Sequence, residues 1–268
     1  MSEISTDLGR RMWWVDAFVG EQARGNPAVV VLLESDLAPE ACQLIAAELG
    51  VAETAFLRRT REGWWEVRCF TPTVEVDLFG HASLAALHVL SVELGVPGPE
   101  VVLSTPAGPI VGRRGATGLT IELPRQEVTA TPPEAVERAL GPVTAAWTTE
   151  AGDLVALVDS VDALCALDPD AVELFVVPAS LVIAVAEGGI DSDLSVRVFA
   201  PRLGVHEDHA TGRAMCSLAP IWHDRTGEVR LLVRQVSPRG GVLLAALQDD
   251  HVEVVGRART YLSGDLWA

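Results

Sequence analysis

The residues VRCFTPTVEVDLFGHASLA at 67–85 and VRVFAPRLGVHEDHATGRA at 196–214 decide the fold, because the second stretch repeats the layout of the first. At an offset of 129 residues, six of the nineteen aligned positions are identical, among them an arginine and a proline that strand composition alone does not produce. In each copy a strand ends in Phe-x-Pro, a short polar loop follows, and a glycine lies near the start of an apolar helix. Two similar lobes are therefore predicted, each directing a loop and a helix N-terminus at a shared cleft. Exposed N–H groups and the helix dipole would bind a carboxylate there.

The composition is that of a folded, acidic globular protein. The chain has 268 residues, enough for one large domain or two of ordinary size, with 49% hydrophobic and 21% charged residues. A formal charge of −17 argues against a nucleic-acid or anionic-membrane partner. All 20 basic residues are arginine, so the chain lacks the lysine needed for a pyridoxal-phosphate Schiff base or a P-loop.

The sequence offers no sign of export, membrane insertion or metal binding. The first eleven residues contain no apolar segment typical of a secretory signal, and the most apolar run, 175–186, is too short to span a bilayer. The four cysteines are widely spaced, with no C-x-x-C and no cluster of histidines, which argues against a disulfide framework and a zinc site. We therefore expect a cytoplasmic protein that holds no metal and acts on a small carboxylate substrate.

Hydrophobic patterning divides the chain into two lobes of mixed strands and helices. The expected elements of the first lobe are strands at 12–18, 27–33, 51–59, 64–71, 100–104, 108–114 and 117–123 and helices at 39–49 and 80–94. Those of the second lobe are helices at 133–140, 160–167 and 211–222 and strands at 144–149, 153–159, 180–187, 194–200, 229–236, 241–248 and 251–257. The helix at 80–94 is apolar nearly all round and should be wrapped by sheet. The Pro- and Thr-rich stretch 124–133 is the predicted boundary between lobes at 12–124 and 133–257, with the tail 258–268 joining the first lobe.

Polar residues lie at three places where the predicted strands and helices meet. Glu53 precedes a run of core-type residues, and residue type alone favours a solvated charge at a strand end. His81 lies at a predicted helix N-terminus, where the dipole disfavours a charged imidazolium and a simple helix cap is the alternative. Glu207, Asp208 and His209 precede the second apolar helix, where an acidic pair is also ordinary capping. In one cleft these groups would form an acid/base constellation able to move a proton between two positions of one substrate, most effectively if burial lifts a carboxyl pKa.

Several short motifs, in order along nearly the whole chain, resemble those of the PhzF-like family of phenazine biosynthesis. They are D-A-F at 16–18, G-N-P-A at 25–28, A-E-T-A-F at 52–56, F-T-P-x-x-E-V-D-L-x-G-H-A at 70–82, F-A-P at 199–201, E-D-x-A-T-G at 207–212 and S-x-R-G-G at 237–241. The resemblance implies an α+β, diaminopimelate epimerase-like fold with two pseudo-symmetric lobes. Each lobe would be a curved, mostly antiparallel sheet, a half-barrel, around a central helix, with the active site in the cleft between the lobes.

The resemblance also implies roles for the site residues. Glu53, in the position of the family's motif glutamate, would be the acid/base that shuttles the proton, with His81 and Asp208 as further catalytic residues. Backbone amides around Gly80 and Gly212 would hold the substrate carboxylate. The other residues that we expect to bind substrate are Asn26, Ala82, Thr211 and Arg213.

A racemase that uses two thiols is disfavoured. Related racemases and epimerases place two cysteines on opposite sides of the substrate, and the repeat puts Phe79 and Asp208 at those positions. Cys69 falls in a predicted strand and Cys216 inside a predicted helix, so both are expected in the core.

The chain departs from the family pattern at three positions. Ala52 stands where a serine usually precedes the motif glutamate, His209 stands in place of a proline, and Arg213 stands in place of a serine or another small residue. A guanidinium beside the cleft could clamp a second substrate carboxylate, point outward, or pair with Glu207.

These observations predict an isomerase that needs no cofactor and shifts a double bond by proton transfer in a small unsaturated cyclic amino or imino acid. The resemblance suggests a place in secondary-metabolite or antibiotic biosynthesis, and it also implies a homodimer. An epimerase or racemase of an amino acid is the nearest alternative, because it would invert a stereocentre on the same fold. A catalytically silent ligand-binding member of the fold is the second alternative, which His209 and Arg213 leave open.

Overall fold

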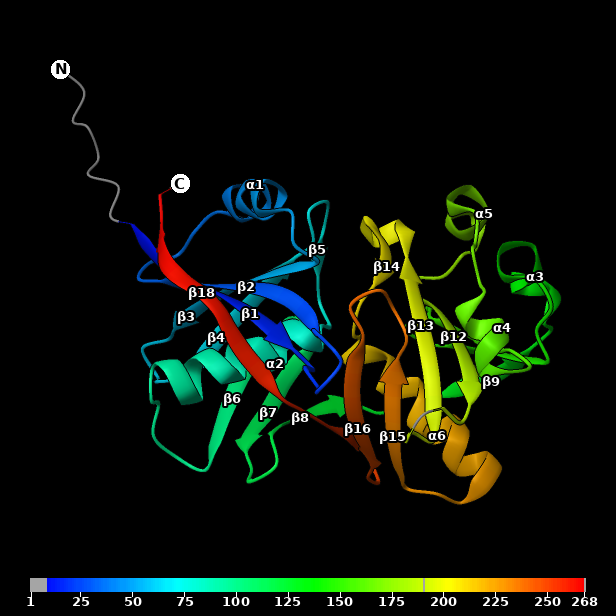
Figure 1. The fold of residues 1–268 in the computed structure, drawn as a ribbon. Helices are drawn as coiled ribbons and strands as arrows, with labels where there is room; N and C mark the ends of the chain where they lie inside the picture. Colours follow the sequence, from blue (N-terminus) through cyan, green and yellow to red (C-terminus); the bar gives the residue numbers. More distant parts are fainter. Residues whose placement is uncertain (1–8, 190, 268) are drawn as a thin grey trace.

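The described chain, residues 9–189 and 191–267 of a computed structural model, forms two halves that lie side by side (Figure 1). The N-terminal half contains β1 (Arg10–Ala17), β2 (Asn26–Leu33), α1 (Pro39–Leu49), β3 (Glu53–Arg59), β4 (Trp65–Phe70), β5 (Glu75–Val76), α2 (His81–His88), the π-helical turn η1 (Val89–Glu93), β6 (Glu100–Thr105), β7 (Gly108–Arg114) and β8 (Leu119–Pro124). The C-terminal half contains β9 (Val128–Thr131), α3 (Glu134–Leu140), β10 (Ala145–Thr149), β11 (Leu154–Leu157), α4 (Val161–Cys165), α5 (Ala171–Val176), β12 (Val182–Glu187), β13 (Leu194–Ala200), η2 (Pro201–Leu203), β14 (Val205–Asp208), η3 (Gly212–Ala214), α6 (Met215–Thr226), β15 (Arg230–Gln235), β16 (Gly241–Leu247) and β17 (His251–Gly256). The last strand, β18 (Ala258–Leu266), follows β17.

The N-terminal half is a curved sheet wrapped around α2. β1 pairs antiparallel with β2, β2 runs parallel to β3, and β3 pairs antiparallel with β4. β4 runs parallel to β6, and β6, β7 and β8 continue as an antiparallel meander. Every residue of α2 is buried, and the helix packs against β1, β2, β3, β7 and β8. A helix that is apolar on all sides requires such an enclosure.

The C-terminal half repeats this plan around α6. β9 to β13 form one run of neighbouring strands, antiparallel except for the pair β11–β12. β13 also lies parallel to β15, which continues antiparallel into β16 and β17. The first eight residues of α6 are buried, and α6 packs against β9, β16 and β17. Helices α3 to α5 lie on the side of the C-terminal half that faces away from the N-terminal half (Figure 1).

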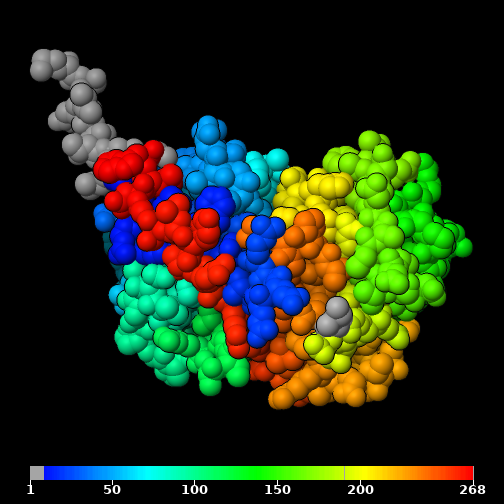
Figure 2. All heavy atoms as spheres, in the orientation of Figure 1, coloured from blue at the N-terminus to red at the C-terminus, as the bar shows by residue number. Residues whose placement is uncertain are grey.

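Three backbone connections join the two halves. β17 pairs antiparallel with β8 over six residues, so the sheet continues from one half into the other. The loop after β1 lies against the loop after β15, where Arg24 N–H donates to the carbonyl of Arg239 at 2.8 Å and Gly25 N–H to that of Gly240 at 3.0 Å. β18 crosses back and pairs antiparallel with β1, and Figure 2 shows this C-terminal strand against the N-terminal segment. The largest hydrophobic cluster accordingly includes residues of both halves.

The internal repeat has a structural basis in two equivalent ion pairs. Arg68 on β4 donates to both carboxylate oxygens of Glu75 on β5, each at 2.7 Å. Arg197 on β13 donates in the same way to Glu207 on β14, at 2.8 and 2.9 Å. Each guanidinium also stacks on the phenylalanine two positions further along its strand, 5.3 and 5.1 Å from the ring centre. The aligned arginines therefore attach each strand to the strand that follows the polar loop.

Local signals set the bounds of the helices, with one correction. α1 begins at Pro39, whose fixed φ suits a first helical position, and ends at Gly50, which has a left-handed φ of 64°. The continuous helix predicted at 80–94 is wrong in its last turn, because α2 ends at His88 and a π-helical turn follows. The Ser91 hydroxyl donates to the carbonyl of Leu87 at 2.6 Å, a bond that bends helices. No helix among residues 9–189 and 191–267 is both long and apolar enough to cross a membrane.

Candidate active site

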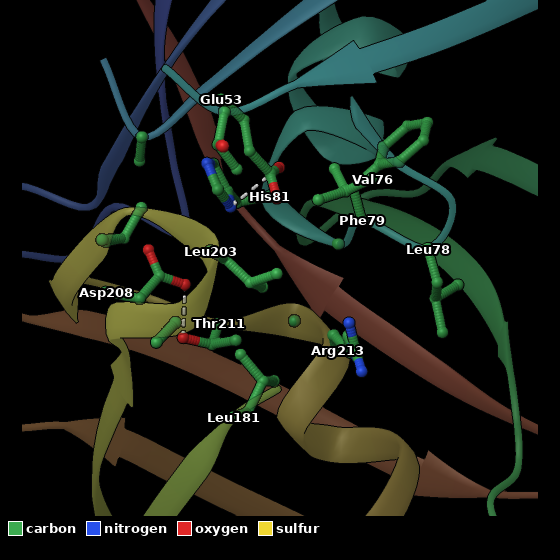
Figure 3. Close-up of a pocket in the computed structure, with 16 residues that line it drawn as sticks. Glu53, Val76, Leu78, Phe79, His81, Leu181, Leu203, Asp208, Thr211 and Arg213 are labelled. Atoms are coloured by element: carbon green, nitrogen blue, oxygen red, sulfur yellow. Dashed lines mark hydrogen bonds and ion pairs between the residues drawn. The ribbon is translucent and has the colours of Figure 1, made fainter. Parts of the chain in front are cut away.

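A cleft lies between the two halves, where the N-terminal ends of α2 and of η3–α6 meet (Figure 3). It encloses about 460 Å³ of atom-free space, part of it open to solvent. The N-terminal half contributes Ala52, Glu53, Thr71, Val76, Leu78, Phe79, Gly80 and His81, and the C-terminal half contributes Leu181, Ala200, Leu203, Val205, Asp208, Thr211, Gly212 and Arg213. A few polar side chains among mostly apolar ones are typical of a site for a small organic molecule.

The two helix ends touch through glycine. A Cβ added to Gly80 would lie 2.7 Å from the backbone nitrogen of Arg213 and 2.7 Å from the Cα of Gly212. Gly80 has a φ of −98°, so glycine is needed here for close approach and not for an unusual backbone conformation. The contact brings the N-terminal ends of two helices to one place, which is a favourable site for a carboxylate.

Glu53 presents its carboxyl group to the cleft from the start of β3. Its side chain is only 14% exposed, and its Oε2 lies 3.2 Å from Nδ1 of His81. Burial raises the pKa of this carboxyl, His81 opposes the rise, and the negative charge of Asp208 adds to it. The backbone amide of Ala82 also acts on the carboxylate and lowers its pKa. A carboxyl group with a raised pKa is suited to both accepting and returning a proton.

His81 is the first residue of α2 and is almost completely buried, at 3% exposure. The N-cap residue of α2 is Gly80, and no side chain caps this helix end. The alternative role of His81 as a helix cap is therefore wrong. Within the described residues, its Nε2 is buried and has no hydrogen-bond partner. A buried nitrogen without a hydrogen bond lowers the stability of the folded state. A bound molecule could supply the missing hydrogen bond, so this atom is available to a ligand.

Asp208 is fixed at the end of β14 by three donors. Its Oδ1 accepts from the amide of Asn26 at 2.6 Å and from the backbone N–H of His209 at 3.1 Å, and its Oδ2 accepts from the Thr211 hydroxyl at 2.6 Å. Asn26 is fully buried and does not line the cleft, so its contact with Asp208 is what links it to the site.

A buried glutamine supports the same loop. Gln235 on β15 is 1% exposed, and its amide nitrogen donates to the carbonyl of Asp208 at 2.6 Å. Its side-chain oxygen accepts from the backbone N–H of Thr211 at 2.8 Å. No motif in the sequence pointed to Gln235, because its role depends on burial and on contacts with residues far from it in the sequence.

Arg213 lines the cleft and is held by a carboxylate that sequence reasoning missed. Its Nε donates to Oδ2 of Asp153 at 3.1 Å and its Nη2 to Oδ1 at 2.6 Å. The guanidinium is 14% exposed and Asp153 is 4% exposed. Burial raises the pKa of Asp153, and the charge of Arg213 opposes that rise. The expectations of an outward side chain and of a pair with Glu207 are wrong, because Glu207 is bound by Arg197.

The remaining sequence-predicted residues lie next to the cleft or in its wall. Ala52, Gly80, Thr211 and Gly212 line it, whereas Ala82 is buried behind it and contributes its backbone amide. His209 is half-buried and outside the lining, and burial lowers the pKa of its imidazole.

One group of described residues has donor atoms close enough to share a metal ion, and it lies outside the cleft. Glu122 on β8 and His251 and Glu253 on β17 have ligand atoms within 4.8 Å of one another. Arg113 already donates to Glu122 and to Glu100 at this place, so a guanidinium supplies the positive charge there.

The chain is similar to known proteins over nearly its whole length. A family model described as phenazine biosynthesis-like protein matches residues 15–264. The chain belongs to the phenazine biosynthesis-like (PhzC-PhzF) family. It is 40% identical over 255 residues to an uncharacterized isomerase of Pseudomonas aeruginosa, with 93% of this chain and 95% of that protein covered.

Solved structures of this family and of epimerases have the same fold. A PhzF-family phenazine biosynthesis protein of Enterococcus faecalis superimposes with a TM-score of 0.85 at 30% identity, covering 97% of this chain and all of the other. A hydroxyproline epimerase of Agrobacterium vitis, with a TM-score of 0.66 at 15% identity over 96% of this chain and 92% of that one, shares the fold. The predicted family and the predicted α+β, epimerase-like fold are confirmed, and the curated relatives named isomerases support an isomerase type of function.

Proposed function

We propose that this protein is an isomerase that moves a double bond in a small unsaturated cyclic amino or imino acid, with Glu53 as the group that carries the proton. The observation that supports this most strongly is the Glu53 carboxyl itself, which is mostly buried, has a raised pKa and faces the cleft beside His81. The fold's relatives among epimerases agree with proton transfer at carbon.

In this proposal the substrate carboxylate binds the amides where α2 and η3–α6 meet. Glu53, as a carboxylate, takes a proton from a carbon made acidic by the adjoining unsaturation. The electron pair released shifts along the conjugated system, and the Glu53 carboxylic acid, whose proton exchanges with water, protonates the carbon at the far end of that system. Nε2 of His81 contacts a polar group of the substrate, and Asp208 accepts a hydrogen bond from the substrate amine.

An amino-acid epimerase is the competing proposal, and the acid groups of the cleft argue against it. Inversion requires an acid and a base on opposite faces of one carbon. Asp208 is held by three donors and Phe79 occupies the other position where a thiol would stand, so Glu53 is the carboxyl best suited to move a proton. Homodimerisation, cytoplasmic location and a place in secondary metabolism stay predictions from the sequence.

Proton NMR in heavy water tests the proposal. The probes are a dihydro-hydroxyanthranilate and a set of amino-substituted cyclohexadiene carboxylates, incubated with wild type, with Glu53→Gln and with Glu75→Gln. Glu75 is a matched control, because its carboxylate lies in an exposed ion pair outside the cleft. We expect one deuterium to enter as the double bond moves, at rates lost in Glu53→Gln and unchanged in Glu75→Gln. Exchange with inversion and no movement of the double bond would favour the epimerase. Binding of every probe without exchange would leave a ligand-binding protein.

A further inference from the structure

Arg213 is the one arginine among the described residues that line the cleft, and its charge is already balanced. Asp153, at the start of β11, contacts it through the edge formed by Nε and Nη2. Asp153 is 4% exposed and makes no other side-chain ion pair within the described residues. The pair therefore brings a neutral unit, and not a free cation, to the wall of the cleft.

The pair forms part of the cleft wall at the N-terminal end of η3–α6. In Figure 3, the side chain of Arg213 lies across the pocket from Asp208, and its charge reaches Glu53, whose pKa burial raises and Arg213 lowers. Nη1 donates to no acceptor among residues 9–189 and 191–267. Two N–H groups on this nitrogen are thus available to a ligand whose ring rests on apolar side chains.

The neutral character of the pair determines which ligand group it accepts. A second carboxylate on Arg213 would place two anions on one cation in a largely buried site that already contains Asp208. A hydroxyl or keto oxygen would accept from Nη1 without adding charge. The buried carboxylate of Asp153, because it already binds the guanidinium, disfavours a substrate with two carboxylates and favours one with a neutral hydrogen-bond acceptor.

We propose that Asp153 is a specificity-determining residue that, through Arg213, restricts the substrate to a monocarboxylic acid with a neutral hydroxyl or keto oxygen at the position that contacts Arg213. The inference rests on the proposed function, because it names the substrate class of the same cleft. Asp153 acts as a positioning residue, since it does not touch the substrate.

Binding of unreactive aromatic acids tests this class directly by calorimetry. The probes are benzoate, 3- and 4-hydroxybenzoate, and the dicarboxylates with the second carboxylate at the same two ring positions, isophthalate and terephthalate. For wild type we expect one of the two hydroxybenzoates to bind roughly 2- to 12-fold more tightly than benzoate, the range for one neutral hydrogen bond. We expect neither dicarboxylate to bind more tightly than benzoate.

Substitutions in the pair make the test specific. Asp153→Asn leaves Arg213 as an uncompensated cation and should tighten binding of one dicarboxylate, relative to benzoate, by roughly 10- to 150-fold, as for a charge-assisted bond. Arg213→Gln should remove the preference for the hydroxybenzoate. Because an unpaired buried arginine disfavours folding, the double variant Asp153→Asn/Arg213→Gln is included, and it should show neither preference.

The inference is overturned by a dicarboxylate that binds wild type more tightly than the matching hydroxybenzoate, by a folded Asp153→Asn variant with unchanged binding ratios, or by a double variant that keeps the hydroxybenzoate preference. Failure of all the probes to bind wild type would also overturn it. Failure of the proposed isomerase is seen separately, as absence of deuterium exchange in substrates that bind, and it leaves these binding ratios unaffected.

Discussion

Replacing Gly80 by alanine should separate the two helix ends that form the cleft. The new Cβ would lie 2.7 Å from the backbone of both Gly212 and Arg213, whereas ordinary contact begins at 3.4 Å. Backbone atoms cannot rotate away as a side-chain tip does, so the helix ends must move apart by about 0.7 Å. The φ of −98° suits alanine, which leaves the clash as the only expected defect.

The expected effects are a moderate loss of stability and a large loss of rate. Overpacking should lower the free energy of unfolding by about 1–3 kcal/mol. Alanine makes the unfolded chain less flexible than glycine does, and this effect offsets about 0.4–1 kcal/mol of the loss. A displacement approaching 1 Å costs up to about 100-fold in rate, so we expect deuterium exchange to fall roughly 10- to 100-fold. Urea unfolding and exchange kinetics measure the two effects.

Gly264→Ala is the matched control, because a Cβ at this position meets nothing within 4 Å. It should leave both the rate and the free energy of unfolding within about 0.5 kcal/mol of wild type. Wild-type exchange by Gly80→Ala, with the same midpoint in urea, would refute the idea that this glycine contact sets the geometry of the cleft.

Four further variants test the site and the fold. Since burial raises the folded-state pKa of Glu53, its contribution to stability is complete below the ordinary glutamate pKa and is lost as pH rises through the folded value. Glu53→Gln should therefore equal wild type at acid pH and exceed it as pH rises, by at most about 1.4 kcal/mol per pH unit, in urea titrations; parallel curves would contradict this. Asn26→Ala removes a donor from Asp208 and should cost roughly 1–3 kcal/mol together with a fall in exchange rate, so unchanged unfolding and exchange would argue against a supporting role. Arg197→Met should lower the free energy of unfolding by roughly 3–5 kcal/mol, because the side chains of its ion pair are only 13% and 11% exposed. Arg68→Met should lower it by about 1 kcal/mol or less, because the side chains of that pair are 27% and 32% exposed. Equal losses would show that burial does not distinguish the two ion pairs.

The predictable part of the site is the part carried by local motifs. Glu53, His81 and Asp208 each stand where a strand or loop meets a helix or strand, and the structure brings all three to one cleft. Two aligned copies of a strand, loop and helix also indicated the two similar halves. These features can be predicted from the sequence because they depend on residues that lie close together in it.

The contacts that were missed join residues far apart in the sequence. Asp153 lies 60 residues before Arg213, and Gln235 lies 24 residues after Thr211, so neither pairing follows from spacing or composition. α5 was also missed, because its six residues are too few to show a helical period. Its signal was Asp170, whose side chain accepts from the first helical N–H groups.

The return of β18 to β1 has a consequence for how the chain folds as it is synthesised. β1 is flanked by β2 on one side and on the other by a strand that starts 240 residues or more along the chain. During synthesis β1 therefore keeps one edge unpaired until β18 emerges from the ribosome. The N-terminal half cannot complete its sheet as an independent vectorial unit, and its closure is tied to the synthesis of β18.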